Sequence, residues 1–499
     1  MTKLGKSNSP RDQRRPKVRS TPEIQWEKVI FDLFERVVRD HPWDGDPDYV
    51  KGAIRARNWS AVLGATKAKP PQLYRGAAEY FAACQVEHIF KKLPIPGSEK
   101  AAEEAAWAQF VSDEKRNRRT NQKFRVLAAR DYRFNNPLYT RLLGRMQAFM
   151  ARVLGPSPNY QAIYECCDFG PGSSVGVGGN ATHPYAKMDR VSSSAGALPY
   201  LMEAIWSNDQ WRGMYTDGKS LDGDWYVECI DPTTFASNLR GSVEITGYNK
   251  IDFVEKNYHI KRSTAGEPVG NGYLQIGAGD EIANRLRQYR RFLSIWDQTR
   301  NQRLAKLGSE CDTRWPYATL DMKSASQSLV REMIRAALAH VPEWFEFLDR
   351  IRSHHYVSQH GEGTYELFVS MGNGFCFPLQ TAIFAAAVEA VYAETGGTVY
   401  GVYGDDIIVD QSSALLLMEW LKELGVRTNR DKSFIFGPFR ESCGADFYNG
   451  TNVRPYVLDF IPTRYRDLIK IANGFSEHAG RPSWSAWWGL WELMPKRVR

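Results

Sequence analysis

The chain has 499 residues, of which 43% are hydrophobic and 24% are charged. That composition is ordinary for a soluble globular protein, and the length exceeds what one core usually holds, so we expect two or three subdomains. Lys and Arg number 65 against 57 Asp and Glu, a net charge of +8 that suits a polyanionic partner such as a nucleic acid.

Cysteine usage and hydropathy exclude several classes of protein. The seven cysteines are scattered and none forms a C-x-x-C pair, which argues against a zinc module or a disulfide framework. No apolar run reaches the length needed to cross a bilayer, and no signal-peptide core lies near the start. We therefore predict a soluble, intracellular protein with no membrane partner.

The N-terminal third is predicted to be mostly helical. Residues 1–22 are basic and rich in Pro and Ser, which predicts a flexible arm that either contacts RNA phosphates or only solubilises the chain. From Ile24 to Met150, apolar residues recur at helical spacing, as in IQWEKVIFDLFERVV and AAEYFAACQVEHIFKKL. A basic run at 114–125 is either a solvated helix face or a surface that faces a nucleic acid.

The residue composition changes in the middle of the chain. Residues 166–180, CCDFGPGSSVGVGGN, predict a loop and match neither a Walker A loop nor a dinucleotide fingerprint. Short β-prone runs with a basic stretch follow, and DEIANRLRQYRRFLSIW (280–296) predicts a helix.

From Tyr317 onward the sequence alternates strands and helices. YATLDM predicts a strand, residues 327–342 a helix, and Pro378 the start of a helix that ends at Gly396. A hairpin is predicted at 398–410, then a helix in SSALLLMEWLKELG and a strand at 428–436. This order predicts an α+β fold in which helices back an antiparallel sheet.

The hairpin TVYGVYGDDIIVD carries two adjacent carboxylates, Asp405 and Asp406, at its turn. Such a pair is either a solvated turn or a divalent-cation site, because hard cations prefer clustered carboxylate oxygens. Asp321 ends the strand YATLD. If both strands share a sheet, three carboxylates converge and can hold two Mg²⁺ ions, with Mn²⁺ as a substitute, for phosphoryl transfer.

Other residues would complete such a site, although each is a weak signal alone. A triphosphate would be clamped by cationic side chains, for which the candidates are Lys256, Lys261 and Arg262. A glycine-rich loop would approach a ribose hydroxyl through Ser370, Gly372, Asn373 and Gly374. Lys432 stands where a cationic general acid would protonate the leaving pyrophosphate.

Several long stretches in the same order carry a family resemblance: ATLDMKSASQSL, SMGNGFCFPLQTAIFA, VYGDDIIV and TNRDKSFIFGPFRESCGADFYNGTNVRPY, with weaker similarity in FVEKNYHIKRSTAGEPVGNGYLQIG and DQTRNQRLAKLGS. Through them the chain resembles the RNA-directed RNA polymerases of the single-stranded RNA phages, the levivirus replicase β subunits. The resemblance implies a right-hand polymerase in which Asp321, Asp405 and Asp406 are metal ligands. One departure is Gln327, which stands where the family usually has a ribose-sensing aspartate.

The resemblance also implies a division of the chain. After the arm, we expect an N-terminal helical region and fingers at 23–230, fingers with the basic motif at 231–310, the palm at 311–456 and a reduced or incomplete thumb at 457–499. In that last segment a stripe of tryptophans at helical spacing predicts a buried helix face, with base stacking as the second interpretation: Trp484, Trp487, Trp488 and Trp491.

By resemblance, the partners are template RNA, nascent RNA, ribonucleoside triphosphates and host translation elongation factors, in the cytoplasm of an infected bacterium. Two rival hypotheses stay open. A reverse transcriptase would share the palm and a carboxylate pair, although Gly404 and the loop SMGNG argue against it. A non-catalytic RNA-binding protein would tolerate replacement of all three aspartates.

Overall fold

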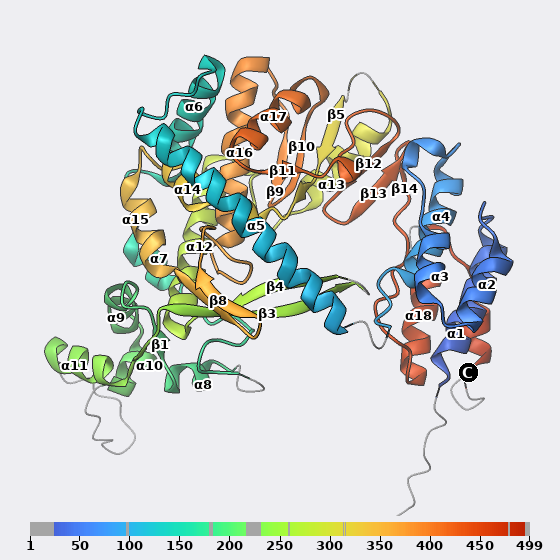
Figure 1. The fold of residues 1–499 in the computed structure, drawn as a ribbon, viewed down its shortest axis with the longest axis horizontal. Coiled ribbons are helices and arrows are strands. Elements are labelled where there is room, and N and C mark those ends of the chain that lie inside the picture. Colours follow the sequence, from blue (N-terminus) through green and yellow to red (C-terminus); the bar gives the residue numbers. More distant parts are fainter. Residues whose placement is uncertain are drawn as a thin grey trace, which may run out of the picture.

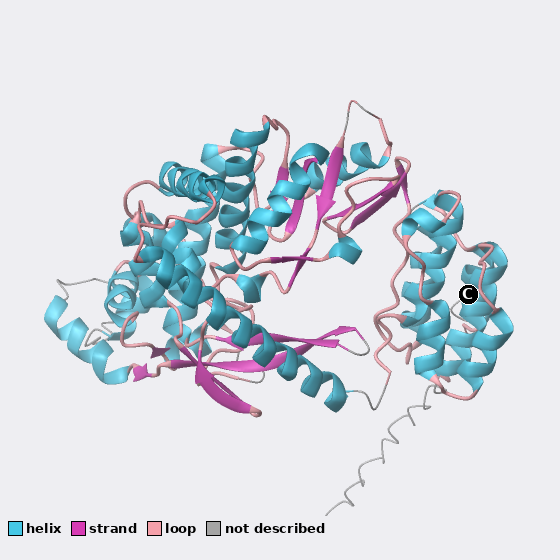
Figure 2. Ribbon diagram, turned by 45° about the horizontal axis from the view of Figure 1, so that its top comes forward, coloured by secondary structure: helices cyan, strands magenta, loops and turns pink. Residues whose placement is uncertain are grey.

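The computed structural model describes residues 24–95, 99–178, 183–215, 231–257, 260–312, 314, 316–477 and 480–494. The arm predicted at residues 1–22 lies outside them. Helices and sheets are both present throughout, which confirms the α+β class (Figures 1 and 2).

Helices from the two ends of the sequence form one lobe beside the rest of the molecule (Figures 1 and 2). Its members are α1 (Trp26–Asp40), α2 (Pro47–Arg55), α3 (Trp59–Thr66), the 3₁₀ turn η1 (Pro71–Leu73), α4 (Ala77–Phe90), α18 (Tyr465–Glu477) and α19 (Trp484–Glu492). All of these helices except η1 contribute side chains to a single apolar core. The Asp40 carboxylate ties the ends together, because it accepts hydrogen bonds from Ser483 Oγ at 2.6 Å and from the Ser485 N–H at 2.7 Å.

The tryptophan stripe on α19 divides between core and solvent. Trp487 and Trp491 stack on each other and pack against the lobe's core. Trp484 and Trp488 are 60% and 52% exposed. The prediction of a buried face therefore holds for half of the stripe, because α18 and α1 cover only one side of this helix.

The body of the molecule contains the remaining helices. They are α5 (Glu99–Ala128), α6 (Pro137–Leu154), α7 (Tyr160–Glu165), α8 (Pro184–Asp189), α9 (Leu198–Trp206), α10 (Asp209–Arg212), η2 (Gly213–Tyr215), α11 (Pro232–Ser242), α12 (Val269–Tyr289), α13 (Thr299–Ser309), η3 (Ser326–Ser328), α14 (Arg331–Ala337), α15 (Pro342–Ile351), α16 (Cys376–Thr395), α17 (Gln411–Glu423) and η4 (Arg430–Lys432). Most of the largest apolar cluster lies among them.

The strands form five small sheets. A three-stranded antiparallel sheet has the order β5-β10-β9, from Tyr317–Leu320, Asp406–Asp410 and Gly401–Tyr403. A four-stranded sheet has the order β4-β3-β7-β8, from Ile260–Gly266, Tyr248–Asn257, His355–Ser358 and Gly361–Thr364. The others are β12-β13-β14 (Phe439–Ser442, Ala445–Tyr448, Thr451–Asn452), β6-β11 (Met322–Lys323, Arg427–Thr428) and the parallel pair β1-β2 (Ser192–Ser193, Glu244–Ile245).

The β5-β10-β9 sheet is covered by helices on both faces. Side chains alternate along β10, so Ile407 and Val409 join the main core with α16 and α17. Ile408 points the other way and packs with Leu304 and Ala305 of α13. Because both faces are buried, the strand is continuously apolar between the aspartates at its two ends.

Helix α16 is the central support of this sheet. It is long and apolar enough to cross a membrane, contrary to the prediction that no run reaches that length, but 83% of its apolar window is buried inside the protein. Its apolar character is therefore explained by contact with neighbouring helices and the sheet. Gly396 ends the helix with φ of +78°, as predicted.

Most of the predicted elements around the hairpin are confirmed: β5, β9, β10, α16 and α17. The helix predicted at 327–342 is shorter, because α14 covers Arg331–Ala337 and is preceded by the 3₁₀ turn η3. Two other predictions are wrong. The segment 428–436 is not a strand: after β11 it forms η4 and then a single bridge between Phe434 and Thr319. The helix predicted at 280–296 instead begins at Val269 and ends at Tyr289, since the small residues at its start allow close packing against neighbouring elements.

Candidate active site

The pairing of β5 with β10 brings the three aspartates to one end of a sheet. Leu320 pairs with Ile407, so one step further along each strand Asp321 reaches Asp406, next to the turn that holds Asp405. Gly404 in that turn has φ of +59°, and a Cβ there would collide with the Phe377 ring. Residues distant in sequence are thus neighbours because of sheet register.

Asp321 is held on two sides by the segment that follows α17. Asn429 donates from its side-chain amide to the Asp321 carboxylate at 2.7 Å, and from its backbone N–H to the Asp321 carbonyl at 2.7 Å. The Asp321 N–H donates to Ser433 Oγ at 3.1 Å. Burial raises the pKa of Asp321, against the lowering effect of Asn429 and of the nearby Lys432 charge.

The pKa of the Asp406 carboxyl group is strongly raised. Burial first, and then the negative charges of Asp405 and Asp321, raise it to about 7. The backbone N–H of Cys443, a residue with φ of +49°, donates to this carboxylate and opposes the rise. The turn that holds Cys443 therefore contacts Asp406.

This group of oxygen donors is chemically suited to a divalent cation. Partly buried carboxylates that raise one another's pKa are the arrangement that a hard cation relieves. Among the residues that the structure describes, however, no three His, Cys, Asp or Glu side chains are gathered closely enough to hold an ion as they stand.

One of the three basic candidates, Lys256, lies near the aspartates, and Arg262 lies near Lys256. Lys256 is on β3 at an irregularity in its pairing with β4, which carries Arg262. Desolvation lowers the pKa of Lys256, and so do the charges of Arg262 and Lys432, while Asp321 and Asp405 oppose the shift. The four charges are thus close enough to influence this one ammonium group.

Lys261 is not brought to this group. Its neighbour along β4 is Arg262, so the two side chains point to opposite faces. The Lys261 ammonium forms an ion pair of 3.1 Å with Glu103 of α5 and is only 14% exposed. Glu103 also contacts His360 in the β7–β8 turn at 3.0 Å. The sequence pattern grouped three cations that the strand alternation divides.

Lys432 lies beside Asp321 and is paired with a residue that the motifs did not single out. Its ammonium is 3.4 Å from the Glu441 carboxylate on β12. Desolvation alone would lower the pKa of Lys432, but the charges of Glu441 and Asp321 outweigh it and raise the pKa. The lysine is therefore protonated across the physiological pH range.

The loop from Ser370 to Gly374 packs tightly between β4 and α12. Gly372 has φ of +107°, and a Cβ there would meet the Ala265 carbonyl oxygen. A Cβ at Gly374 would lie 2.6 Å from the backbone nitrogen of Ile276. Asn373 is 5% exposed, and its side chain accepts from the Phe375 N–H at 3.0 Å at the start of α16. Gly372, Asn373 and Gly374 therefore determine the conformation of the loop. The side chain of Ser370 is half-buried.

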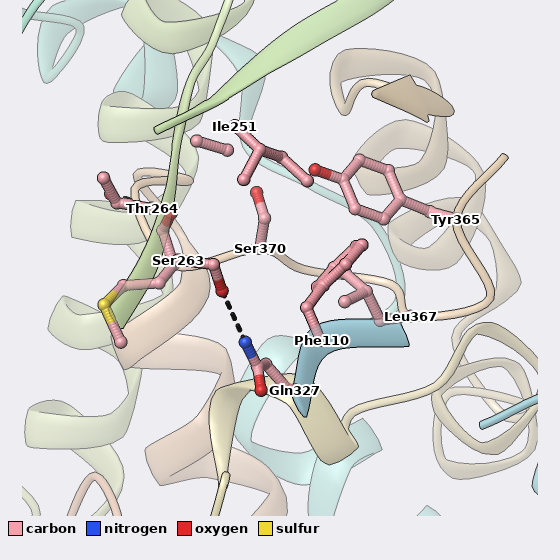
Figure 3. A pocket seen from close by; sticks show the side chains of 10 residues that line it. Phe110, Ile251, Ser263, Thr264, Gln327, Tyr365, Leu367 and Ser370 are labelled. Carbon is pink, nitrogen blue, oxygen red and sulfur yellow. Dashed lines mark hydrogen bonds between the residues drawn. The ribbon is translucent and has the colours of Figure 1, made fainter. Parts of the chain in front are cut away.

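Gln327 and Ser370 line the same small pocket between β4 and α5 (Figure 3). The Gln327 amide donates to Ser263 Oγ at 2.6 Å, as the dashed line in Figure 3 marks. Ser370 Oγ lies 3.4 Å from Glu267 Oε1. The pocket thus brings Gln327 together with Ser370 of the glycine-rich loop and with Ser263 of β4.

Sequence reasoning missed Asn429, Ser433 and Glu441. All three lie in the quoted stretch TNRDKSFIFGPFRESCGADFYNGTNVRPY, and Asn429 and Ser433 are close to Lys432 in the sequence. The pairing of Glu441 with Lys432 cannot be read from that stretch, since it depends on how β12 turns back toward the sheet.

The profile of the family described as RNA replicase, beta-chain, matches residues 50–484, which is most of the chain. The chain belongs to the RNA replicase beta-chain family. The β5–β10 aspartates, the basic hairpin and the loop at 370–374 all lie within the matched region.

Curated relatives of this replicase family come from RNA phages. The chain is 28% identical over 401 residues to the RNA-directed RNA polymerase subunit beta of Enterobacteria phage SP, covering 78% of this chain and 62% of that protein. It is 30% identical over 394 residues to the subunit beta of Escherichia virus Qbeta, covering 78% and 60%. Against the beta chain of Escherichia phage MS2 it is 42% identical over 212 residues, covering 42% and 37%.

The chain thus spans about three fifths of the length of the SP and Qbeta relatives. Among solved structures, the BmCPV RNA-dependent RNA polymerase at elongation state aligns with a TM-score of 0.42 and 11% identity, over 69% of this chain and 32% of that one.

Proposed function

We propose that this replicase chain is an RNA-directed RNA polymerase that adds ribonucleotides to an RNA 3′ end and releases pyrophosphate. The observation that carries the proposal is the register of β5 with β10, which sets Asp321 beside Asp405 and Asp406. Template RNA, nascent RNA and ribonucleoside triphosphates are the partners that this reaction requires. Host translation elongation factors and a site of action in the host cytoplasm stay predictions from the family resemblance.

In this proposal Asp321, Asp405 and Asp406 would hold two divalent cations, Mg²⁺ or Mn²⁺. Bound cations of this kind activate an attacking hydroxyl and neutralise a leaving pyrophosphate. The residues of the chain itself bind and orient the substrates. Asn429 holds the Asp321 carboxylate in place through its 2.7 Å hydrogen bond.

The basic residues would bind the triphosphate and supply a proton. Lys256 lies near Asp321 and Asp405, and Arg262 lies near Lys256, so both would contact the phosphates, a role that the ion pair with Glu103 denies to Lys261. Lys432 is kept protonated by Glu441 and Asp321, so its ammonium can donate a proton to the leaving pyrophosphate oxygen.

The pocket of Gln327 and Ser370 would contact the ribose. The Gln327 nitrogen is engaged by Ser263, so the amide oxygen is the atom left to accept from a 2′-hydroxyl. In the same proposal β5, β9, β10 and their helices form the palm, and the β3–β4 hairpin belongs to the fingers. The lobe of helices from the two ends of the sequence would correspond to the thumb.

Replacing Asp405 by Asn tests the function. With the full chain and any host factors that it requires, Asp405→Asn should abolish nucleotide incorporation while the Kd for RNA stays within about twofold. Asp252→Asn is a matched control, because Asp252 lies on β3 outside the site and its carboxylate forms an ion pair with Lys250 at 3.4 Å. A wild-type chain that binds RNA but never incorporates nucleotides under these conditions would contradict the proposal.

A further inference from the structure

The first turn of helix α13, together with the residue before it, contacts two hairpins at the candidate site. These are the β9–β10 hairpin, which holds the aspartates, and the β12–β13 hairpin. Gln298 donates to the Tyr403 hydroxyl at 3.0 Å, and Arg300 donates from Nε to the Tyr400 carbonyl at 3.0 Å. Both acceptors belong to the β9 segment of the aspartate hairpin. Figure 1 shows α13 between β5 and the β12–β13 hairpin.

The next two residues of the helix reach further into the site. Asn301 is 4% exposed, and its amide donates to the Asp406 carbonyl at 3.1 Å and to Ser442 Oγ at 3.3 Å. Gln302 donates to the Cys443 carbonyl at 3.0 Å. The motif DQTRNQ thus supplies contacts both to the aspartate hairpin and to the turn between β12 and β13.

These contacts close a ring around Asp406. Asn301 joins the Asp406 backbone to Ser442, Gln302 holds Cys443, and the Cys443 N–H returns to the Asp406 carboxylate. Gly401 completes the fit, because a Cβ there would collide with Asn301 Oδ1. The buried Asn301 amide donates to two acceptors, the Asp406 carbonyl and Ser442 Oγ. It fixes the distance between them, because leaving either buried acceptor without its hydrogen bond costs free energy.

We propose that Asn301 is a positioning residue that sets the Asp405–Asp406 turn where it can receive a divalent cation, a statement that rests on the proposed function. The α13 turn acts through the hairpin backbone and does not contact substrate. Loss of this amide should let the turn shift relative to Asp321. Small displacements of this kind reduce rates by about a hundredfold when reacting groups must be aligned.

The test compares Asn301→Ala and Asn301→Asp with Asn271→Ala. Asn271 is a matched control because it is fully buried in α12 and likewise donates to one backbone carbonyl, that of Ile351, and to one serine hydroxyl, that of Ser194. Mn²⁺ binding is measured by electron paramagnetic resonance on folded protein, together with the unfolding temperature and the kcat and KM for nucleotide incorporation.

For both Asn301 variants we expect about tenfold weaker Mn²⁺ binding and a kcat about ten- to a hundredfold lower, with KM for the nucleotide and Kd for RNA within about twofold. Asn271→Ala should lower the unfolding temperature without changing Mn²⁺ affinity. Wild-type Mn²⁺ affinity in the Asn301 variants would overturn the proposal, and so would an equal loss in Asn271→Ala.

Two further measurements keep the outcome decisive. If the Asn301 variants do not fold, Gln302→Ala loosens the same ring from its other side and should also weaken Mn²⁺ binding, while wild-type affinity there overturns the proposal. If the wild-type chain makes no RNA, the proposed function fails separately, and Mn²⁺ binding alone then decides whether Asn301 positions the turn.

Discussion

Asn429 binds Asp321 twice, through a side-chain hydrogen bond of 2.7 Å to the carboxylate and a backbone hydrogen bond of 2.7 Å to the carbonyl. The first bond is made to a group that would hold a cation, so it orients a ligand. The second joins the segment after β11 to the end of β5. Together they make the position of Asp321 depend on a residue that lies far along the sequence.

Asn429→Ala should lower kcat by about ten- to a hundredfold, because a hydrogen bond to a charged group contributes about 1.5–3 kcal/mol. KM for the nucleotide should change little, as the amide does not face the triphosphate. Asn136→Ala, which removes the N-cap of α6 away from the site, controls for lost stability. Steady-state incorporation at saturating RNA measures the effect, and an unchanged kcat would count against a role for Asn429.

Glu441→Gln should move the alkaline limb of the pH–rate profile to lower pH. Glu441 is the largest of the charges that raise the pKa of Lys432, so removing it lowers that pKa. Because the acid is active only when protonated, activity is then lost at a lower pH than in the wild type. Glu362→Gln, exposed on β8, should leave the profile in place. A profile that does not move in Glu441→Gln would exclude Lys432 as the titrating acid.

Gln327→Ala should weaken selection of ribose. The amide oxygen is proposed to accept from the 2′-hydroxyl, and a neutral hydrogen bond contributes about 0.5–1.5 kcal/mol, or about two- to tenfold in relative kcat/KM. Competition between UTP and dUTP measures that ratio. Strong preference of the wild type for dUTP would favour the reverse-transcriptase hypothesis, and unchanged discrimination in Gln327→Ala would assign ribose selection elsewhere.

The helical lobe should lose stability as the pH falls. Burial lowers the pKa of His88 on α4 to about 3, so the unfolded chain takes up this proton at higher pH than the folded one. From pH 7 to pH 5 this difference removes about 2 kcal/mol, taking the unfolded pKa as about 6.5. Denaturant unfolding of wild type and His88→Gln tests it, with exposed His340→Gln as control. Equal pH dependence in all three would refute the assignment to His88.

Local sequence patterns predicted the elements whose formation depends mainly on neighbouring residues. The hairpin follows from apolar runs on either side of Gly404, and the end of α16 follows from Gly396, because both glycines adopt φ values that other residues avoid. The family motifs also identified the three aspartates. These features are encoded over a few residues and can be read without knowing what packs around them.

Tertiary structure decided which side chains meet. Strand alternation sends Lys261 to Glu103 while Arg262 lies near Lys256, and a pattern of cations in the sequence does not distinguish them. The segment 428–436 has strand-like residues, yet it turns because Asp321 offers hydrogen-bonding partners to Asn429 and Ser433. Helices α1 and α19 share a core although they lie at opposite ends of the chain. Burial and hydrogen bonding act between residues brought together by the fold, so distance along the sequence does not reveal these pairs.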